Sequence, residues 1–157
     1  MRKTVFPLAA AVALAGSWVL ADTPPGEVAF GESGAIEASL TGAPGNPDEG
    51  ANVMSSRALG NCVACHQVSS LSADFQGNIG PPLDGAGDRW DAAQLRGIVA
   101  DAKHTFEGSM MPSFYKTGPY DRPGDAYTGK AAPAELPPIL SATQIEDVVA
   151  YLVTLKE

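Results

Sequence analysis

Apolar residues recur at the spacing of an amphipathic helix near the end of the chain. Five of them fall on one face of that helix: Ile145, Val148, Val149, Leu152 and Leu155. Steps of three and four residues are typical of a helix that packs one side against a core. Ser141 and Gln144 precede this face at the spacing of a capping box, which predicts that the helix begins directly after Ser141.

A second helix is predicted over residues 89–103. Its apolar face repeats at the same steps: Leu95, Ile98, Val99 and Ala102. Asp88 precedes the repeat and is the predicted N-cap, because its short carboxylate can accept from the free N–H groups of the first turn.

A third helix is predicted to begin at Asn46 and to run to about Gly60. Asn46 is the expected N-cap, proline follows at the first helical position, and Glu49 stands at the third. Three residues of this helix are expected in the core: Ala51, Met54 and Ala58.

The chain is rich in glycine and proline, with 17 Gly and 13 Pro in 157 residues, which indicates many loops. Residues 77–87 and 117–138 are predicted as loops. The second exceeds the usual loop length, which favours either contact with a partner or a packed surface insertion. Because no stretch alternates as a strand would, the predicted fold class is mainly α, with helices joined by long Pro/Gly-rich loops.

The first residues have the pattern of a secretory signal peptide. Arg2 and Lys3 precede an apolar run, and the small residues before Asp22 predict cleavage after Ala21. The run is shorter than the ~20 residues that span a bilayer, so an uncleaved anchor is the weaker alternative. Export to the periplasm is expected. Residues 22–45 are predicted to form an extended acidic arm, and residues 46–157 the domain.

The net charge narrows the choice of partners. Ten basic and 18 acidic residues give a formal charge of −8, and loss of two basic residues with the signal peptide leaves −10. Such a charge opposes binding to nucleic acid or to an anionic membrane surface. It favours a partner protein with a basic surface.

Cys-Val-Ala-Cys-His begins at Cys62 and has the C-x-x-C-H pattern of c-type haem attachment. The thiols of Cys62 and Cys65 can add to two vinyl groups of one porphyrin. His66 then supplies an imidazole nitrogen to the iron. The sequence therefore predicts one covalent haem c.

Three other interpretations of this motif are less well supported than haem attachment. A disulfide is possible in an exported protein, but the motif already employs both cysteines. A dithiol redox pair would follow a strand, and none is predicted there. A zinc site needs more Cys or His ligands, and only His104 remains.

A buried imidazole ligand needs a partner for its second ring nitrogen. The loop at residues 77–87 is rich in glycine and contains two adjacent prolines, so its backbone can approach the haem edge. The carbonyl of Pro81 or Pro82 is the predicted partner of His66.

The opposite face of the iron needs a ligand or stays open. Met110 and Met111 precede a proline that biases the backbone of Met111 toward an extended conformation, and a thioether there can reach the iron. Met111 is favoured, with Met110 as the alternative. Met54 is interpreted as a core residue, and His104 as a solvated residue at a helix end.

Several sequences along the chain together resemble class I cytochromes c over residues 46–157. They are the helix start at residue 46, Cys-Val-Ala-Cys-His, Gly-Pro-Pro-Leu, the Met-Pro loop and the terminal Asp-Val-Val-Ala-Tyr-Leu helix. Within that group, Gly-Asn-Ile-Gly-Pro-Pro-Leu, Ser-Met-Met-Pro-Ser-Phe-Tyr and the acidic extension resemble the SoxX family, the monohaem subunits of SoxAX cytochromes. The resemblance implies a class I cytochrome c fold around one haem.

The resemblance also implies a function. Cys62 and Cys65 would form the thioethers, and His66 and Met111 would be the axial ligands. SoxAX couples thiosulfate oxidatively to a cysteine of a carrier protein, with loss of two electrons. The SoxX-like chain takes these from a larger haem-bearing SoxA-like subunit and passes them to a small cytochrome. With both cysteines joined to haem, no thiol remains, so no catalytic sulfur-transfer residue is expected here.

Two alternatives belong to other functional classes. One is a free-standing carrier cytochrome that serves another dehydrogenase or oxidase. The other is a haem enzyme or gas sensor with an open sixth position, which would require Met111 to be absent from the iron or labile.

Overall fold

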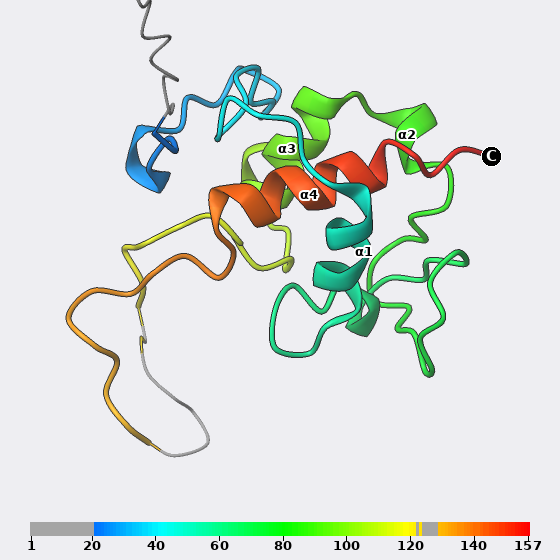
Figure 1. The fold of residues 1–157 in the computed structure, drawn as a ribbon. Coiled ribbons are helices and arrows are strands. Elements are labelled where there is room, and N and C mark those ends of the chain that lie inside the picture. Colours follow the sequence, from blue (N-terminus) through cyan, green and yellow to red (C-terminus); the bar gives the residue numbers. More distant parts are fainter. Residues whose placement is uncertain (1–20, 122, 124–128) are drawn as a thin grey trace, which may run out of the picture.

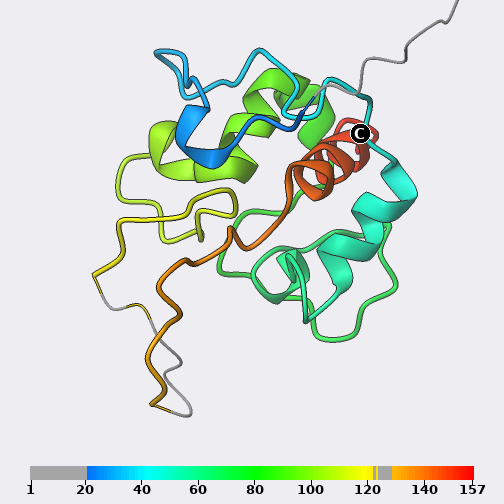
Figure 2. The same cartoon turned by 60° about the vertical axis from the view of Figure 1, so that its left-hand side comes forward.

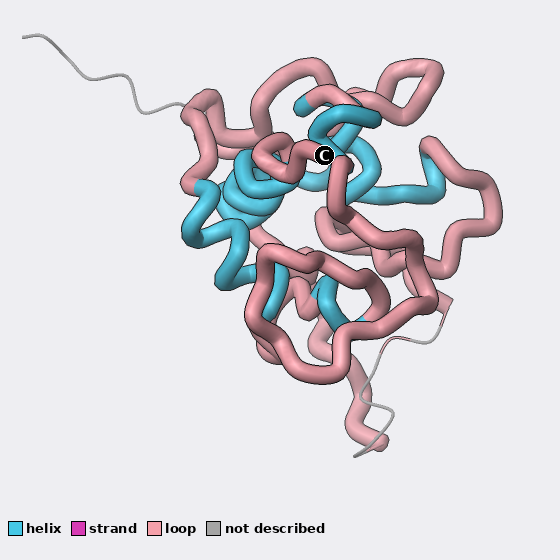
Figure 3. Tube along the Cα trace, turned by 90° about the vertical axis from the view of Figure 1, so that its right-hand side faces the viewer, coloured by secondary structure: helices cyan, strands magenta, loops and turns pink. Residues whose placement is uncertain are grey.

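The computed structural model describes residues 21–121, 123 and 129–157. These residues form four α-helices and three short 3₁₀ helices in the order η1, α1, η2, α2, α3, η3, α4, and Figure 1 labels the α-helices. Their bounds are Pro25–Glu27, Pro47–Ser55, Cys62–Ala64, Ala86–Arg89, Ala92–Asp101, Ala102–His104 and Ala142–Leu152. No strand occurs in this part of the chain, and loops make up much of the rest (Figure 3). The predicted mainly α fold class is confirmed.

The predicted signal peptide lies outside the described residues, except for Ala21. Within the described ranges, no helix has the length and apolar character needed to cross a membrane.

Helix α4 is the central element of the fold. It packs against α1 on one side and α3 on the other (Figures 1 and 2). The capping box predicted at its start is present, because Ser141 accepts from Gln144 N and Gln144 reaches back to Ser141 N. Four residues of its predicted apolar face lie buried in the helix, and Ile145 has no exposed surface. The fifth, Leu155, is also buried but lies beyond the helix end at Leu152.

Helix α1 lies close against α4 because Gly50 has no side chain. A Cβ at Gly50 would stand 2.1 Å from the carbonyl oxygen of Asp147, much closer than any real contact. Asn46 caps α1 by accepting from Asp48 N at 3.0 Å, as predicted, and Met54 is fully buried.

Two sequence predictions about the helices are wrong. Helix α1 ends at Ser55 rather than near Gly60, and Ala58 lies exposed in the turn that follows. The chain must leave the helical path there, since the haem motif forms its own 3₁₀ turn a few residues on.

The helix predicted over residues 89–103 is also divided. Trp90 is extended, with φ −136°, and separates α2 from α3. The N-cap of α3 is Asp91, which forms a full capping box with Gln94. Asp88 instead lies inside α2, where it accepts from Glu157 N at 2.9 Å and pairs with Lys156. These contacts lower the pKa of the Asp88 carboxyl below its usual range.

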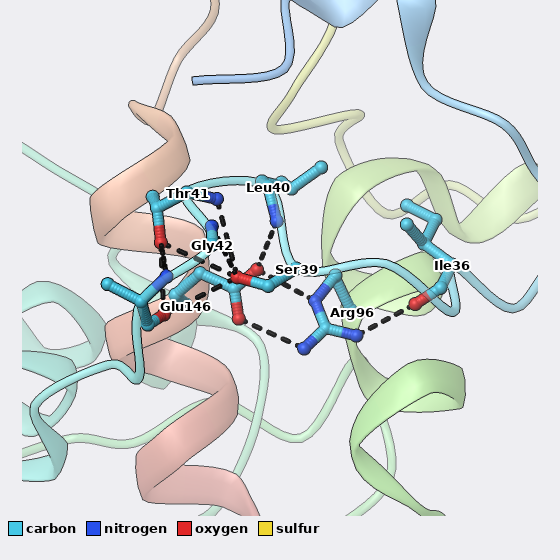
Figure 4. A network of polar contacts seen from close by, with 8 residues as sticks. Ile36, Ser39, Leu40, Thr41, Gly42, Arg96 and Glu146 are labelled. Carbon is cyan, nitrogen blue, oxygen red and sulfur yellow. Dashed lines mark hydrogen bonds and ion pairs between the residues drawn. The ribbon is translucent and has the colours of Figure 1, made fainter. Parts of the chain in front are cut away.

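Residues 22–45 lie against both α3 and α4 and contribute Ala35, Ile36 and Leu40 to the core. A buried ion pair holds them there (Figure 4). The Arg96 guanidinium donates to both carboxylate oxygens of Glu146, at 2.8 and 3.0 Å. It also donates to the carbonyl of Ile36 at 2.7 Å.

The same carboxylate of Glu146 accepts from Leu40 N at 2.7 Å, so both helices bind the segment directly. The predicted boundary between arm and domain at residue 46 stays a prediction.

Candidate haem-binding site

The first part of the site is one tight turn that carries Cys62, Cys65 and His66. Asn61 enters it in the left-handed region, at φ 46°, which asparagine tolerates better than most residues. Cys65 N and His66 N then both donate to the carbonyl of Cys62, at 3.1 and 2.9 Å. The sequence motif is therefore also a structural unit, with two thiols and an imidazole on three of five successive positions around the turn.

Both thiols are free rather than joined in a disulfide. Burial raises the pKa of Cys62 to about 11, aided by the charge of Cys65 and opposed by a backbone hydrogen bond. Cys62 is consequently a protonated thiol at neutral pH. Addition of a thiol across a vinyl double bond places its sulfur on one carbon and its hydrogen on the other.

The His66 ring has one nitrogen engaged and one available. Its Nδ1 lies 2.7 Å from the carbonyl oxygen of Pro81. Because a carbonyl can only accept, Nδ1 carries the proton and Nε2 presents a lone pair. This confirms the predicted partner and selects Pro81 over Pro82.

The loop that carries Pro81 is tied back to the cysteine turn. Gly77 N donates to the carbonyl of Val63 and Gly80 N to that of Cys65, both at 2.8 Å. From the other side, Arg89 donates to the carbonyls of Asp84 and Pro82, at 2.8 and 3.2 Å. These bonds hold the Pro81 carbonyl in place against the imidazole.

Gly80 is required for this fit. A Cβ at this position would lie 2.2 Å from Cε1 of His66 and 2.6 Å from Nδ1. We therefore expect Gly80→Ala to displace the imidazole and to weaken its bond to Pro81. The holoprotein should lose roughly 1–3 kcal/mol of unfolding free energy in a urea titration.

Gly26→Ala is the matched control, because a Cβ at Gly26 meets nothing within 4 Å. Equal urea midpoints for the two variants would contradict the role assigned to Gly80.

The second part of the site is the Met-Pro loop after α3. Met110 is 81% exposed, whereas Met111 is half-buried and packs against the apolar core that Cys62 also borders. The loop returns to the core through Tyr115 N, which donates to the carbonyl of Ala100 at 3.0 Å. Of the two adjacent methionines, only Met111 is turned toward the interior.

His104 has a different environment. Its ring is exposed and stacks on Phe30, with centroids 3.8 Å apart and an angle of 12° between the planes. The His104 ring therefore packs against the N-terminal segment rather than toward the core. This leaves Met111 as the better candidate for the sixth ligand.

Sequence reasoning missed three residues that shape this site: Gly80, Arg89 and Lys103. Lys103 donates to the carbonyl of Met111 at 2.6 Å. Gly80 belonged to a loop already expected near the haem, so a glycine beside the ligand could have been suspected. Arg89 and Lys103 act on backbone carbonyls, which carry no sequence signal.

The donor set fits haem c. Two free thiols, an imidazole with a free Nε2 and a thioether match two vinyl groups and two axial positions. Among the described residues, no cluster of three or more His, Cys, Asp or Glu side chains could hold a metal ion instead. The residues that would hold haem are thus Cys62, Cys65, His66 and Met111.

Comparison with known proteins agrees with this fit. Residues 48–156 match the family model described as cytochrome c. The chain belongs to the cytochrome c family, which implies a covalently attached haem c.

A chain in the crystal structure of SoxXA from P. pantotrophus is 64% identical to this one. The match covers 87% of this chain and all of that chain, with a TM-score of 0.83. The predicted resemblance to SoxX is confirmed. No curated protein matches the chain.

Proposed function

We propose that this chain is the electron-transfer subunit of a SoxXA-type complex. The observation that carries the proposal is the 64% identity over the whole length of a SoxXA chain. The chain would carry one haem, attached through Cys62 and Cys65. Its axial ligands would be His66 and Met111.

Haem c supplies a one-electron iron couple. The residues around it hold its ligands rather than take part in bond making. Pro81 keeps the proton on Nδ1 of His66 and so leaves Nε2 as the ligating atom. Met111, which is half-buried against the core, would close the other side and leave no position for substrate.

This arrangement suits electron transfer for two reasons. Methionine ligation raises the reduction potential relative to two histidines, which favours accepting an electron from a donor haem. A core that holds both ligands in place keeps their geometry similar in the two oxidation states, so little rearrangement accompanies transfer. A chain whose two thiols are both used in thioethers has none left to carry sulfur.

The proposed partners follow from the complex. A larger SoxA-like subunit would donate electrons, and a small cytochrome would accept them. The whole complex would couple thiosulfate to a cysteine of a carrier protein. The acidic mature chain should dock on basic surfaces, and this docking should weaken as salt rises.

We also propose that the protein acts in the periplasm after cleavage at Ala21. The packing of the described residues supports this boundary. Thr23 N donates to the carbonyl of Leu40 at 2.7 Å, and Tyr115 donates to the carbonyl of Thr23 at 2.6 Å. Both bonds lie within the part of the chain that cleavage after Ala21 would leave, so the proposed mature protein keeps them. The arm of residues 22–45 and the domain of residues 46–157 would together form the mature protein.

The test is purification of the tagged full-length protein from periplasm at low salt, after mild crosslinking. We expect a second, larger haem protein to co-purify, and the pair to consume thiosulfate in the presence of a carrier-protein thiol. A lone monomer with one haem under these conditions would overturn the subunit assignment and favour a free-standing carrier. Mass analysis of the same sample checks the N-terminus at Asp22.

A further inference from the structure

The Met-Pro loop is held by a side chain from outside it. Lys103, in η3 at the end of α3, donates from Nζ to the carbonyl of Met111 at 2.6 Å. The same ammonium lies 3.4 Å from Oγ of Ser113. Lys103 therefore bridges both residues that flank Pro112.

Asp101 contacts both the backbone and the ammonium of Lys103. Its carboxylate accepts from Lys103 N at 3.2 Å and lies 4.0 Å from Nζ. Asp101 is buried, whereas the Lys103 side chain is 46% exposed. Holding a long, partly exposed lysine side chain in one position costs rotamer entropy, so the net contribution of the contact is smaller than the strength of its hydrogen bond alone.

The bridge acts where the loop has few bonds of its own. Pro112 has no N–H, and it restricts Met111 to extended conformations. On its other side, the bond that Met111 N makes among the described residues is a long one, to Oγ of Ser109 at 3.3 Å. Lys103 thus provides the shorter and charge-assisted of the two bonds that hold the Met111 backbone.

The orientation of this backbone decides which methionine faces the core. Met110 and Met111 are adjacent, yet one is 81% exposed and the other packs against the core. Rotation of the peptide after Met111 would move its carbonyl away from Lys103. Because Pro112 cannot change its own φ to compensate, such a rotation would also turn the Met111 side chain relative to the loop that follows.

We propose that Lys103 is a positioning residue that holds the Met111 thioether in its ligating orientation. The inference rests on the proposed role of Met111 as axial ligand. Lys103 itself touches no iron and no substrate; it acts through the carbonyl of the ligand residue.

The test compares three variants of the purified holoprotein. Lys103→Met keeps the aliphatic stem and removes the donor, and Lys103→Arg keeps a charged donor. Lys116→Met is the matched control, because Lys116 lies over the Tyr120 ring at 5.8 Å in the same region. The readouts are imidazole binding to the ferric protein and the near-infrared absorption band of a thioether ligand.

We expect Lys103→Met to raise the apparent imidazole affinity by about tenfold and to weaken the thioether band, since a partly exposed charged hydrogen bond contributes on this scale. Lys103→Arg should restore much of the parent behaviour, and Lys116→Met should match the parent. Parent-like affinity in Lys103→Met would overturn the proposal.

A second pair of variants separates this proposal from the ligand assignment. In a Met111→Leu background, Lys103→Met should cause no further rise in imidazole affinity, because the coupling between the two sites is then gone. An equal rise in both backgrounds would overturn positioning through Met111. If Met111→Leu alone leaves imidazole affinity unchanged, the ligand assignment fails instead.

Discussion

Met111→Leu should open the sixth coordination position of the haem iron. Leucine has a volume close to that of methionine and should preserve the packing of residue 111 against the core. It has no sulfur, so the ferrous protein should bind CO without denaturant. The reduction potential should fall by on the order of 0.1 V, within the ~0.8 V that axial ligands can span.

Met110→Leu is the matched control one residue away. Met110 is 81% exposed, and its sulfur points away from the core that Met111 contacts. We expect its CO binding and potential to equal those of the parent. The reverse result, an open site in Met110→Leu and a closed one in Met111→Leu, would show the ligand choice to be wrong.

Arg96→Met should destabilise the protein by about 3–5 kcal/mol, the usual effect of removing one partner of a buried ion pair. The Arg96 and Glu146 side chains are only 10% and 5% exposed. Without the guanidinium, the carboxylate keeps one bond, from Leu40 N, and the carbonyl of Ile36 loses its charged donor. Urea unfolding of the holoprotein measures the loss.

Lys156→Met is the control for the general effect of losing a charge. Lys156 pairs with Asp88 at 3.2 Å, but the two side chains are 55% and 48% exposed. Exposed pairs of this kind contribute about 0–1 kcal/mol. A loss in Arg96→Met no larger than in Lys156→Met would contradict the structural role of the buried pair.

The ion pair also predicts where the structure opens first. Arg96 and Glu146 bind the backbone of residues 36–40 and hold it across α3 and α4 (Figure 4). In Arg96→Met, cleavage by a protease should therefore begin in residues 22–45, at conditions where the helices remain folded. Simultaneous cleavage throughout the chain would mean that this segment has no separate stability.

Local sequence patterns predicted the parts of the fold that depend on neighbouring residues. The capping box at Ser141 and the Asn46 cap need only atoms two or three positions away, and both are present. The Cys-Val-Ala-Cys-His turn is similarly local. The bond from His66 to Pro81 spans 15 residues, but the adjacent prolines in a glycine-rich loop made it predictable.

The two wrong helix predictions concern residues that fit a local helix pattern but make other contacts in the folded chain. Asp88 is a residue type that often caps helices. Asp91 caps α3 instead, because it forms a full capping box with Gln94, and Asp88 binds the C-terminal residues. Ala58 fits the helical repeat of α1, yet the chain leaves the helix at Ser55 to form the cysteine turn. In both places the choice depended on contacts that a helical periodicity does not include.

By itself the sequence determined the start of α1, the start of α4 and the C-x-x-C-H motif, and it limited the expected sixth ligand to two adjacent methionines. Those features follow from spacing along one chain segment. Only the tertiary structure decided that Met111 rather than Met110 faces the core, that Lys103 holds its carbonyl, and that Arg96 and Glu146 join residues 36–40 to α3 and α4. Each of these depends on burial or on a backbone carbonyl brought close by folding. Neither the burial of a side chain nor its distance to a remote carbonyl can be inferred from the type of a single residue.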